Sequence, residues 1–497
     1  MRRGGFIMKR FRHSVIFSAA LLLIFLLFSF KTDAYAQDKV NKIDELVKTY
    51  YDYKQFTGSV LVAEGGKVIY KKGFGLANRE WNIPNKPDTK FRLGSITKQF
   101  TSMLILQLVE QGKIDLEGKL SDYLPYYRED IGSQVTIHHL LTHSSGIPSY
   151  TSIPHFFEDI SRDPYPVEEF VKKYCSGDLE FEPGSKFLYN NSGYFLLGAI
   201  IEEITGKTYE EVLKEKIFAP LGMKNSGYDR HDPIIPNRAT GYSITFDGSI
   251  NAPYLDMSLP YAAGSLYSTV EDLYLWDQSL CTEKLLSAKM KALLFTPYIQ
   301  GYGYGWGIKE KSLPDSEEKL TSISHGGGIN GFNTWIERII QGKHLIVLLN
   351  NTPRARLDQM SDAIIRILYD KPYDLPQKSI AEAMYKTWKE KDVQTAIKQY
   401  ETLKKEHPEE FTFAESELNN LGYYLLENKK KTEDALEIFK LNIKAYPKYA
   451  NGYDSLAEAY MISGNKDLAI KNYAKSLELD PNNTNAIEKL NQLIKEK

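Results

Sequence analysis

Ser95 and Lys98 are the residues of this chain whose types and spacing first indicate chemistry. They stand at the start of an apolar run, Met103–Val109, that predicts a helix ending near Gly112. Positions three apart lie on one face of a helix, so the hydroxyl and the amine would be neighbours. Free backbone N–H groups at a helix start also favour developing negative charge. A serine beside an amine that can lose its proton is a nucleophile suited to acyl transfer.

This spacing alone does not establish a site. An ordinary helix start with a surface lysine gives the same pattern. The chain contains the pattern twice more in polar, turn-like surroundings, from Ser316 to Lys319 and from Ser463 to Lys466. A catalytic interpretation therefore requires further groups that converge on Ser95.

Two later stretches carry such groups. Tyr189 and Asn191 are two residues apart at the start of an apolar helix, where both side chains can point into one cleft. His325 leads three glycines, Gly326–Gly328, on a probable strand. Glycine lets the backbone approach a ligand closely, so this strand is a candidate wall of the same cleft.

The surrounding elements predict an α+β domain. A helix over Asp38–Tyr53 and a hairpin of Gly58–Ala63 with Lys67–Tyr70 come first, a helical block follows, and strands return late. Such runs favour one antiparallel sheet, in which the early hairpin pairs with the late strands and the helical block is an insertion. The remaining predicted elements are helices at Val135–Gly146, Asn191–Thr205, Tyr209–Ile217, Glu271–Leu280, Ser287–Leu294 and Asn351–Tyr369, and strands at Gly301–Ile308, Gly331–Ile340 and His344–Asn350.

The three motifs resemble, in order, those of the serine β-lactamase and penicillin-binding-protein superfamily, specifically its class C β-lactamase-related branch. They are Ser95-x-x-Lys98, Tyr189-x-Asn191 and His325-x-Gly327. The resemblance covers residues 38–370 and implies a β-lactamase/transpeptidase-like fold, with an antiparallel sheet flanked by helices plus a helical region. Flanking segments that also look similar are Thr136–Ile147, Pro220–Met223 and Ala262–Ser265.

The resemblance implies a serine hydrolase that works through an acyl-enzyme. Ser95 would be the nucleophile, and Lys98 and Tyr189 would share the role of general base. Tyrosine has an ordinary pKa of about 10 and lysine of about 10.4, so one of them must lose its proton with help from burial or nearby positive charge. No cofactor and no metal is implied.

The resemblance also implies the substrate contacts. Asn191 would orient Lys98 and the substrate amide, and the backbone N–H groups of Ser95 and Gly328 would form the oxyanion hole. His325 and Gly327 would contact the substrate. His325 takes the place that lysine holds in class C β-lactamases, and histidine is only partly charged at neutral pH. This favours D,D-carboxypeptidase, D-aminopeptidase or esterase activity over a dedicated β-lactamase, with β-lactams as slow suicide substrates.

A different kind of sequence follows a proline-containing linker at residues 371–378. Residues 379–497 are almost entirely helical in pattern, and three alanines are each followed twelve residues later by a proline. These pairs are Ala396 and Pro408, Ala435 and Pro447, and Ala469 and Pro481. The pattern resembles tetratricopeptide repeats, which implies a concave surface for a protein or peptide partner. A plain helical bundle is the alternative.

The N-terminus predicts export. Basic residues precede an apolar run, Val15–Phe30, and Ala34-Tyr35-Ala36 follows as a cleavage site. This is the arrangement of a signal peptide over residues 1–36, and it predicts a periplasmic or secreted protein. The alternative, an uncleaved anchor, would make this segment the chain's contact with a membrane. The run of about 16 residues is short for a membrane span.

Composition narrows the partners. The chain has 497 residues and a net charge of −2, which gives no support for nucleic-acid binding. The expected partners are a peptide, peptidoglycan-fragment or ester substrate and a protein on the repeats. Cys175 and Cys281 are the only cysteines; they either pair after export or remain as two free, buried thiols.

Three other interpretations compete with this one. His139 and His143 are four apart on a predicted helix beside His138, but the glutamate of a zinc H-E-x-x-H motif is missing, which favours structural histidines. An α/β-hydrolase requires G-x-S-x-G, which the chain lacks. The third is a catalytically weak penicillin-binding-type scaffold whose repeats bind a protein or peptidoglycan partner.

Overall fold

The computed structural model describes residues 37–353 and 355–495. The predicted signal peptide lies outside these residues. Contacts divide the chain into two compact units, one ending at Leu375 and the other beginning at Pro376, and the second also contains the turn Thr245–Gly248. Within the described residues, no helix combines the length and apolar character needed to cross a membrane.

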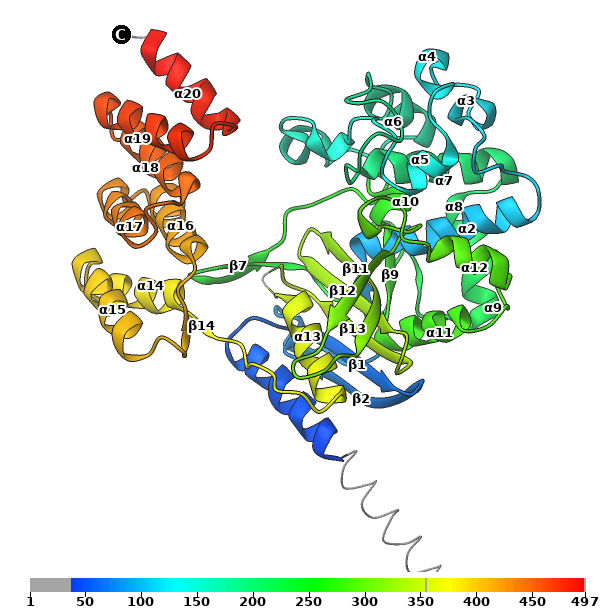
Figure 1. Ribbon diagram of the computed structural model, residues 1–497, viewed down its shortest axis with the longest axis horizontal. Coiled ribbons are helices and arrows are strands. Elements are labelled where there is room, and N and C mark those ends of the chain that lie inside the picture. The colour runs from blue at the N-terminus through cyan, green and yellow to red at the C-terminus, as the bar shows by residue number, and fades with distance from the viewer. Residues whose placement is uncertain (1–36, 354, 496–497) are drawn as a thin grey trace, which may run out of the picture. The chain divides into compact units, whose positions relative to one another are not determined.

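A six-stranded antiparallel sheet forms the centre of the first unit (Figure 1). Its order is β10-β11-β12-β13-β1-β2. The early strand β1 pairs with the late strand β13, with Val60 opposite Leu348, so the predicted closure of the sheet is confirmed. The strands are β1 (Gly58–Glu64), β2 (Lys67–Phe74), β10 (Gly307–Ser312), β11 (Lys319–Ile329), β12 (Phe332–Ile339) and β13 (His344–Asn350).

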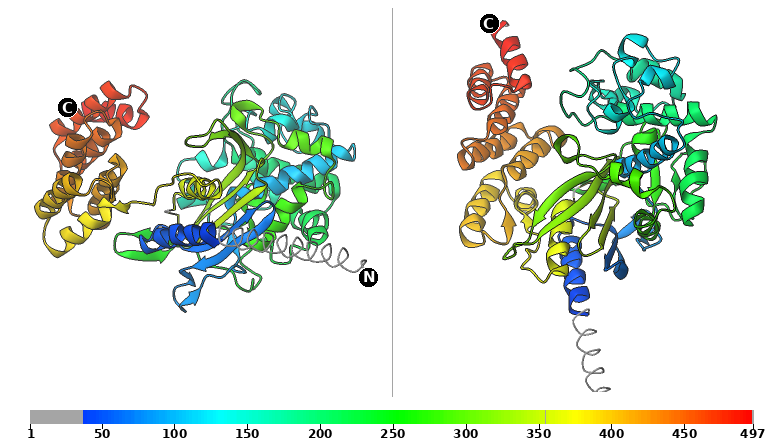
Figure 2. Two further views of the ribbon diagram at one scale, coloured as in Figure 1. Left: turned by 60° about the horizontal axis from the view of Figure 1, so that its bottom comes forward. Right: turned by 45° about the vertical axis from the view of Figure 1, so that its right-hand side comes forward.

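Both faces of this sheet are covered, because alternate residues of its central strands are apolar on both sides. Val60 and Ile346 pack against the helix 37–52 and α13 (Leu357–Leu368) on one face. Leu61 and Val347 face the larger core that contains α2 and α7. Figure 2 shows the helix 37–52 and α13 close to the sheet in two further views.

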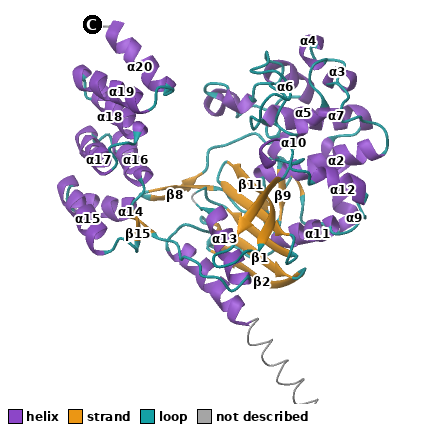
Figure 3. Cartoon of the chain, viewed as in Figure 1, coloured by secondary structure: helices purple, strands orange, loops and turns teal. Residues whose placement is uncertain are grey.

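The helical block lies between the early and late strands in sequence and forms the region around α2 to α10 in Figure 3. It contains α2 (Thr97–Glu110), α3 (Leu120–Tyr123), α4 (Glu129–Gly132), α5 (Ile137–Leu141), α6 (Val167–Tyr174), α7 (Asn191–Thr205), α8 (Tyr209–Leu213), α9 (Ala219–Leu221), α10 (Tyr261–Gly264), α11 (Val270–Leu280) and α12 (Ala288–Leu294). Short strands accompany it: β3 (Leu76–Asn78), β4 (Ile83–Pro84), β5 (Phe91–Arg92), β6 (Gly227–Tyr228), β7 (Tyr242–Thr245), β8 (Gly248–Asn251) and β9 (Leu266–Ser268).

Two local predictions were wrong. The strand expected over Gly301–Ile308 begins only at Gly307, because Gly301 and Gly305 have φ of 75° and 78° and turn the chain. The two cysteines are free thiols, and Cys281 is exposed although Cys175 is buried as expected. Cys281 follows the last residue of α11, where the helix ends at the surface.

The second unit is a series of helix pairs: α14 (Ile380–Glu390) with α15 (Val393–Glu406), α16 (Glu415–Tyr423) with α17 (Thr432–Ala445), and α18 (Ala450–Ile462) with α19 (Lys466–Leu479), followed by α20 (Thr484–Lys495). Two short strands, β14 (Lys378–Ser379) and β15 (Phe411–Thr412), pair in parallel. The three marker alanines, Ala396, Ala435 and Ala469, are completely buried. Each marker proline comes two residues after its helix ends, where it cannot continue the helix.

The turn Thr245–Gly248 was not expected in this unit. The Phe246 ring lies 5.2 Å from the Tyr385 ring and 5.1 Å from the Tyr424 ring. Asp247 accepts hydrogen bonds from Lys389 at 2.8 Å and from Lys429. Both lysines hold the pKa of Asp247 below its ordinary value. Asp247-Gly248 between alternating apolar residues is typical of a hairpin turn, but nothing in the sequence indicates that this turn packs against the later helices.

We expect a chain ending at Leu375 to fold and to keep hydrolysis of a small ester, because the sheet and its two cores lie before that point. The truncation removes the aromatic partners of Phe246, so the same truncation carrying Phe246→Ser is the matched control for solubility. Thermal unfolding and ester turnover are the measurements. Failure of both truncated chains to fold would contradict the division.

Candidate active site

Ser95 lies in a tight turn, Gly94–Ile96, that leads directly into α2. Gly94 has φ of +56°, and a Cβ placed there would lie 2.9 Å from the backbone nitrogen of Gly328. Glycine is therefore required both by the left-handed backbone and by the approach of β11. The predicted helix start is confirmed, and it presents the Ser95 hydroxyl to a cavity.

Lys98 lies one turn further along α2 with no exposed surface. Its Nζ atom is 3.1 Å from Ser95 Oγ and donates hydrogen bonds to Asn191 Oδ1 and to the Ala263 carbonyl, both at 2.9 Å. All three partners are uncharged. Burial lowers the pKa of Lys98 well below its ordinary value, since the ammonium loses its hydration without gaining a carboxylate.

Tyr189 is the second candidate base. Lys98 Nζ lies 4.9 Å from the centre of its ring, and the Ser95 hydroxyl lies close enough to act on the pKa of its phenol. The residue is 38% exposed, yet its hydroxyl lies deep enough among protein atoms that desolvation raises the pKa of Tyr189. Burial thus shifts the pKa values of the two candidates in opposite directions. The lowered pKa of Lys98 favours its neutral amine, and the raised pKa of Tyr189 favours its neutral phenol.

His143 holds the backbone on both sides of Tyr189. The Leu188 N–H donates to the His143 carbonyl at 2.9 Å, and the Asn190 N–H donates to His143 Nδ1 at 3.0 Å. The two rings lie 4.2 Å apart. Sequence reasoning placed His143 among satisfied structural histidines, but its buried Nε2 has no hydrogen-bond partner in the described residues. Its φ of 57° was not predictable from residue type.

His138, His139 and His143 do not come together as the metal site considered from the sequence. The helix α5 ends at Leu141, so His143 lies beyond it and does not share a face with His139. His139 Nδ1 accepts a hydrogen bond from the Thr136 N–H at 3.2 Å, and His138 Nδ1 bonds the Tyr304 hydroxyl at 2.8 Å. In the part of the chain that the structure describes, neither belongs to a cluster close enough to hold an ion.

Asn191 is the first residue of α7, directly after its N-cap. The capping side chain is Asn190, whose Oδ1 accepts from the Gly193 N–H at 2.8 Å. Asn191 Oδ1 accepts from Lys98, and Asn191 Nδ2 donates to Thr151 Oγ1 at 3.1 Å. Thr151 was missed as a site residue, because a single threonine in a loop has no distinguishing spacing.

The glycines after His325 let β11 pass beside the nucleophile. The neighbouring strand β10 pairs with β11 only as far as Ser324, so the later part of β11 has a free edge. A Cβ on Gly327 would lie 1.9 Å from the Leu93 carbonyl oxygen. Thr334 on β12 donates to that same oxygen at 2.7 Å. Gly328 lines the cavity together with Ser95.

His325 itself is directed into the protein. Its Nδ1 lies 2.6 Å from the Gly326 carbonyl oxygen, and its Nε2 lies 2.9 Å from the Tyr302 hydroxyl. These contacts are satisfied by a neutral ring that carries its proton on Nδ1. Burial, and then the charge of Lys98, lower the pKa of His325 to about 4. His325 does not line the cavity, so its predicted substrate contact stays a prediction.

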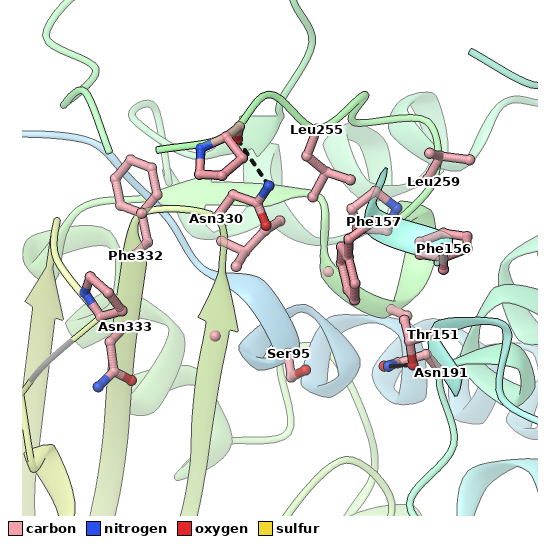
Figure 4. A pocket seen from close by; sticks show the side chains of 18 of the residues that line it. Ser95, Thr151, Phe156, Phe157, Asn191, Leu255, Leu259, Asn330, Phe332 and Asn333 are labelled. Carbon is pink, nitrogen blue, oxygen red and sulfur yellow. Dashed lines mark hydrogen bonds between the residues drawn. The ribbon is translucent and has the colours of Figure 1, made fainter. Parts of the chain in front are cut away.

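The cavity in front of Ser95 has a volume of about 760 Å³. Figure 4 shows Ser95 at the start of α2 below Asn330 and Phe157, with Thr151 and Asn191 to one side. The walls come from the segment 150–157, the segment 253–264 and the end of the β11–β12 hairpin. The first two of these walls belong to the segments 149–180 and 225–264, which lie between the motif residues in sequence.

Comparisons with known proteins identify the class. The β-lactamase family model matches residues 41–369. Penicillin-binding protein 4* of Bacillus subtilis (strain 168) is 30% identical over 390 residues, covering 73% of this chain and 82% of that protein. Teichoic acid D-alanine hydrolase of Staphylococcus aureus is 31% identical over 277 residues, covering 54% and 66%. The structure of a penicillin binding protein from Bacillus halodurans matches with a TM-score of 0.57 at 30% identity, covering 65% of this chain and 98% of that one.

The chain belongs to the β-lactamase family. Within it, the chain is a serine hydrolase of the penicillin-binding-protein and β-lactamase type. The matched residues, 41–369, lie within the part of the chain that forms the first unit, apart from the turn Thr245–Gly248.

We expect Gly327→Ala to destabilise the protein and abolish activity, because its Cβ would push the Leu93 carbonyl and the Ser95 turn away from β11. Gly328→Ala is the matched control, since a Cβ there meets nothing within 4 Å. The melting temperature should fall for the first variant by several degrees, corresponding to about 1–3 kcal/mol of overpacking, and should be nearly unchanged for the second. Equal melting temperatures would contradict the proposed tight approach.

Proposed function

We propose that this chain is an exported serine hydrolase of the class C β-lactamase-related branch that cleaves amides or esters through an acyl-enzyme on Ser95. Its activity is of the D,D-carboxypeptidase, D-aminopeptidase or esterase kind rather than that of a dedicated β-lactamase. The observation that carries the proposal is the set of partners around Lys98. The chain's relatives include a penicillin-binding protein and a teichoic acid D-alanine hydrolase, and these names support a peptide or D-alanyl compound as the substrate.

The neutral form of Lys98 suits a general base. A neutral amine has two N–H bonds and one lone pair, and the carbonyl oxygens of Asn191 and Ala263 accept the two N–H groups. The lone pair then faces Ser95 Oγ at 3.1 Å. The Ser95 proton moves to Lys98 as Oγ bonds to the substrate carbonyl carbon, which gives a tetrahedral oxyanion.

The oxyanion would be received by the backbone N–H groups of Ser95 and Gly328, each worth about 3–4 kcal/mol in related sites. Tyr189, as a neutral phenol beside Ser95, delivers a proton to the leaving group when the carbon–leaving-group bond breaks. The proton on Lys98 then replaces the one that Tyr189 gave. Water hydrolyses the ester by the reverse proton path and releases Ser95.

The substitution of lysine by His325 supports the preference against β-lactams. The lowered pKa leaves His325 neutral at pH 7, and both its ring nitrogens contact protein groups. A neutral, occupied imidazole gives no permanent cation for a substrate carboxylate, whether in a β-lactam or at a D-Ala-D-Ala terminus. Of the activities proposed, this supports the esterase and D-aminopeptidase kinds more than the D,D-carboxypeptidase kind.

A second role is proposed for the helix pairs. The buried marker alanines and the prolines after every second helix support tetratricopeptide-like repeats, and such repeats bind peptides or proteins on one face. The alternative to enzyme action, a scaffold that works through these repeats, predicts that Ser95→Ala preserves partner binding and the cellular phenotype.

Incubation of residues 37–497 with a labelled penicillin, a D-Ala-D-Ala peptide and a short-chain nitrophenyl ester tests the proposal. We expect turnover of at least one substrate and a covalent adduct that peptide mass spectrometry places on Ser95. The variant Ser95→Ala should lose both. An adduct on another residue, or no turnover of any of the three, would contradict the assignment.

The pH dependence should follow Lys98. Activity requires its neutral amine, so activity is present above the lowered pKa of Lys98 and is lost as pH falls through it. We expect the acid limb of kcat/KM to persist in His325→Gln, which keeps an acceptor for the Tyr302 hydroxyl. Lys98→Arg, a permanent cation, should lose at least about 100-fold in rate. Disappearance of the limb in His325→Gln would assign it to the histidine instead.

A further inference from the structure

The cavity in front of Ser95 has an apolar wall and a neutral polar rim. The apolar side chains come from the segments 156–157 and 255–259 and from the end of β11 and the start of β12: Phe156, Phe157, Leu255, Leu259, Ile329 and Phe332. On the rim, Asn330 Nδ2 donates to the Pro253 carbonyl at 2.9 Å and Asn333 Nδ2 donates to the Ala355 carbonyl at 2.7 Å. The rim amides are thus held in place by backbone and carry no charge.

No charged side chain lines this cavity in the described residues. In particular, the lining contains no aspartate or glutamate. The environment of Lys98 agrees, since burial alone accounts for its lowered pKa and no carboxylate offsets it. The nearest basic group to the reacting atoms is Lys98 itself, at 3.1 Å from Ser95 Oγ.

A free α-amino group would be poorly placed in such a site. In an aminoacyl ester or amide, this nitrogen is two bonds from the carbonyl carbon that Ser95 attacks. As an ammonium it would leave water beside the basic Lys98 and an apolar wall, with no carboxylate to pair with. Burial of an unpaired charge costs several kcal/mol, whereas an alkyl or acylamino group in the same place gains from the apolar contacts.

We propose that the site selects acyl groups that carry no charge next to the scissile carbonyl, namely simple alkanoyl or N-acylated D-aminoacyl groups, and discriminates against free D-aminoacyl groups. This inference rests on the proposed function of Ser95 and narrows it. Of the activities considered above, it favours esterase or N-acyl peptide hydrolysis and disfavours D-aminopeptidase activity.

Three methyl esters that differ only at the α-carbon test the inference: propionyl, N-acetyl-D-alanyl and D-alanyl. At pH 7 we expect kcat/KM for at least one of the two neutral esters to exceed that for D-alanyl by at least about tenfold, because the ammonium is unpaired. The D-alanyl value should rise toward the others at pH 9, above the α-amino pKa of about 8. Ser95→Ala gives the background rate.

A variant supplies the missing acid. Phe157 lines the cavity and is 49% exposed, so Phe157→Asp places a carboxylate there with little risk to folding. The control is Ile462→Asp, at an equally exposed position in the second unit. We expect only the first variant to shift the ratio of D-alanyl to propionyl turnover upward, by about tenfold if the ammonium pairs with the new carboxylate.

The outcomes separate the two claims. A preference for D-alanyl over both neutral esters in the unmodified protein overturns this inference and leaves the hydrolase assignment intact. Turnover of none of the three esters counts against the proposed function itself. An equal shift in both aspartate variants would show that charge in the cavity does not govern selectivity, which also overturns the inference.

Discussion

The burial of one lysine is the constraint on which the site depends. Lys98 has no exposed surface and, among the residues that the structure describes, no acidic partner, so its ammonium form is disfavoured at the point where a base is needed. Its neighbours Asn191 and Ala263 present carbonyl oxygens, which a neutral amine can satisfy while its lone pair remains directed at Ser95. A carboxylate in place of either would stabilise the ammonium and remove the base.

The fold brings these groups together from distant parts of the chain. Ser95 and Lys98 come from the turn and first residues of α2, Asn191 comes from the capped start of α7, and Ala263 comes from α10. The sheet contributes its free edge, where Gly327 allows β11 to run against the Ser95 turn. Both faces of the sheet are covered, and the site lies where that edge meets the helical block.

Side chains with distinctive chemistry were predictable from sequence, whereas the backbone groups that surround Lys98 and Tyr189 were not. Type and spacing identified Ser95, Lys98 and Tyr189, and hydrophobic periodicity predicted the sheet and most helices. The Ala263 carbonyl and the left-handed backbone of His143 have no signature in residue type. The division of roles between Lys98 and Tyr189 also required the fold, because burial displaces the pKa of the two groups in opposite directions.

For the cavity in front of Ser95, the location was predictable from sequence but the chemistry of its lining was not. Its location was predictable from the motifs, and two of its walls come from the segments 149–180 and 225–264. That the lining lacks an acidic side chain among the described residues emerged only from tertiary structure, since acidic residues are frequent in those segments, as at Glu158, Asp159 and Asp256. Selectivity is therefore a property of which side chains turn inward, and sequence alone does not report it.

A measurement of the protonation state of Lys98 tests most directly whether this residue is the neutral general base. In a protein labelled with ¹³C at the lysine Cε atoms, and with Lys98→Met used to assign the signal, the chemical shift of Lys98 can be followed against pH. We expect Lys98 to lose its proton well below the ordinary lysine pKa of about 10.4. A Lys98 signal that stays in the ammonium form up to pH 10 would contradict this expectation.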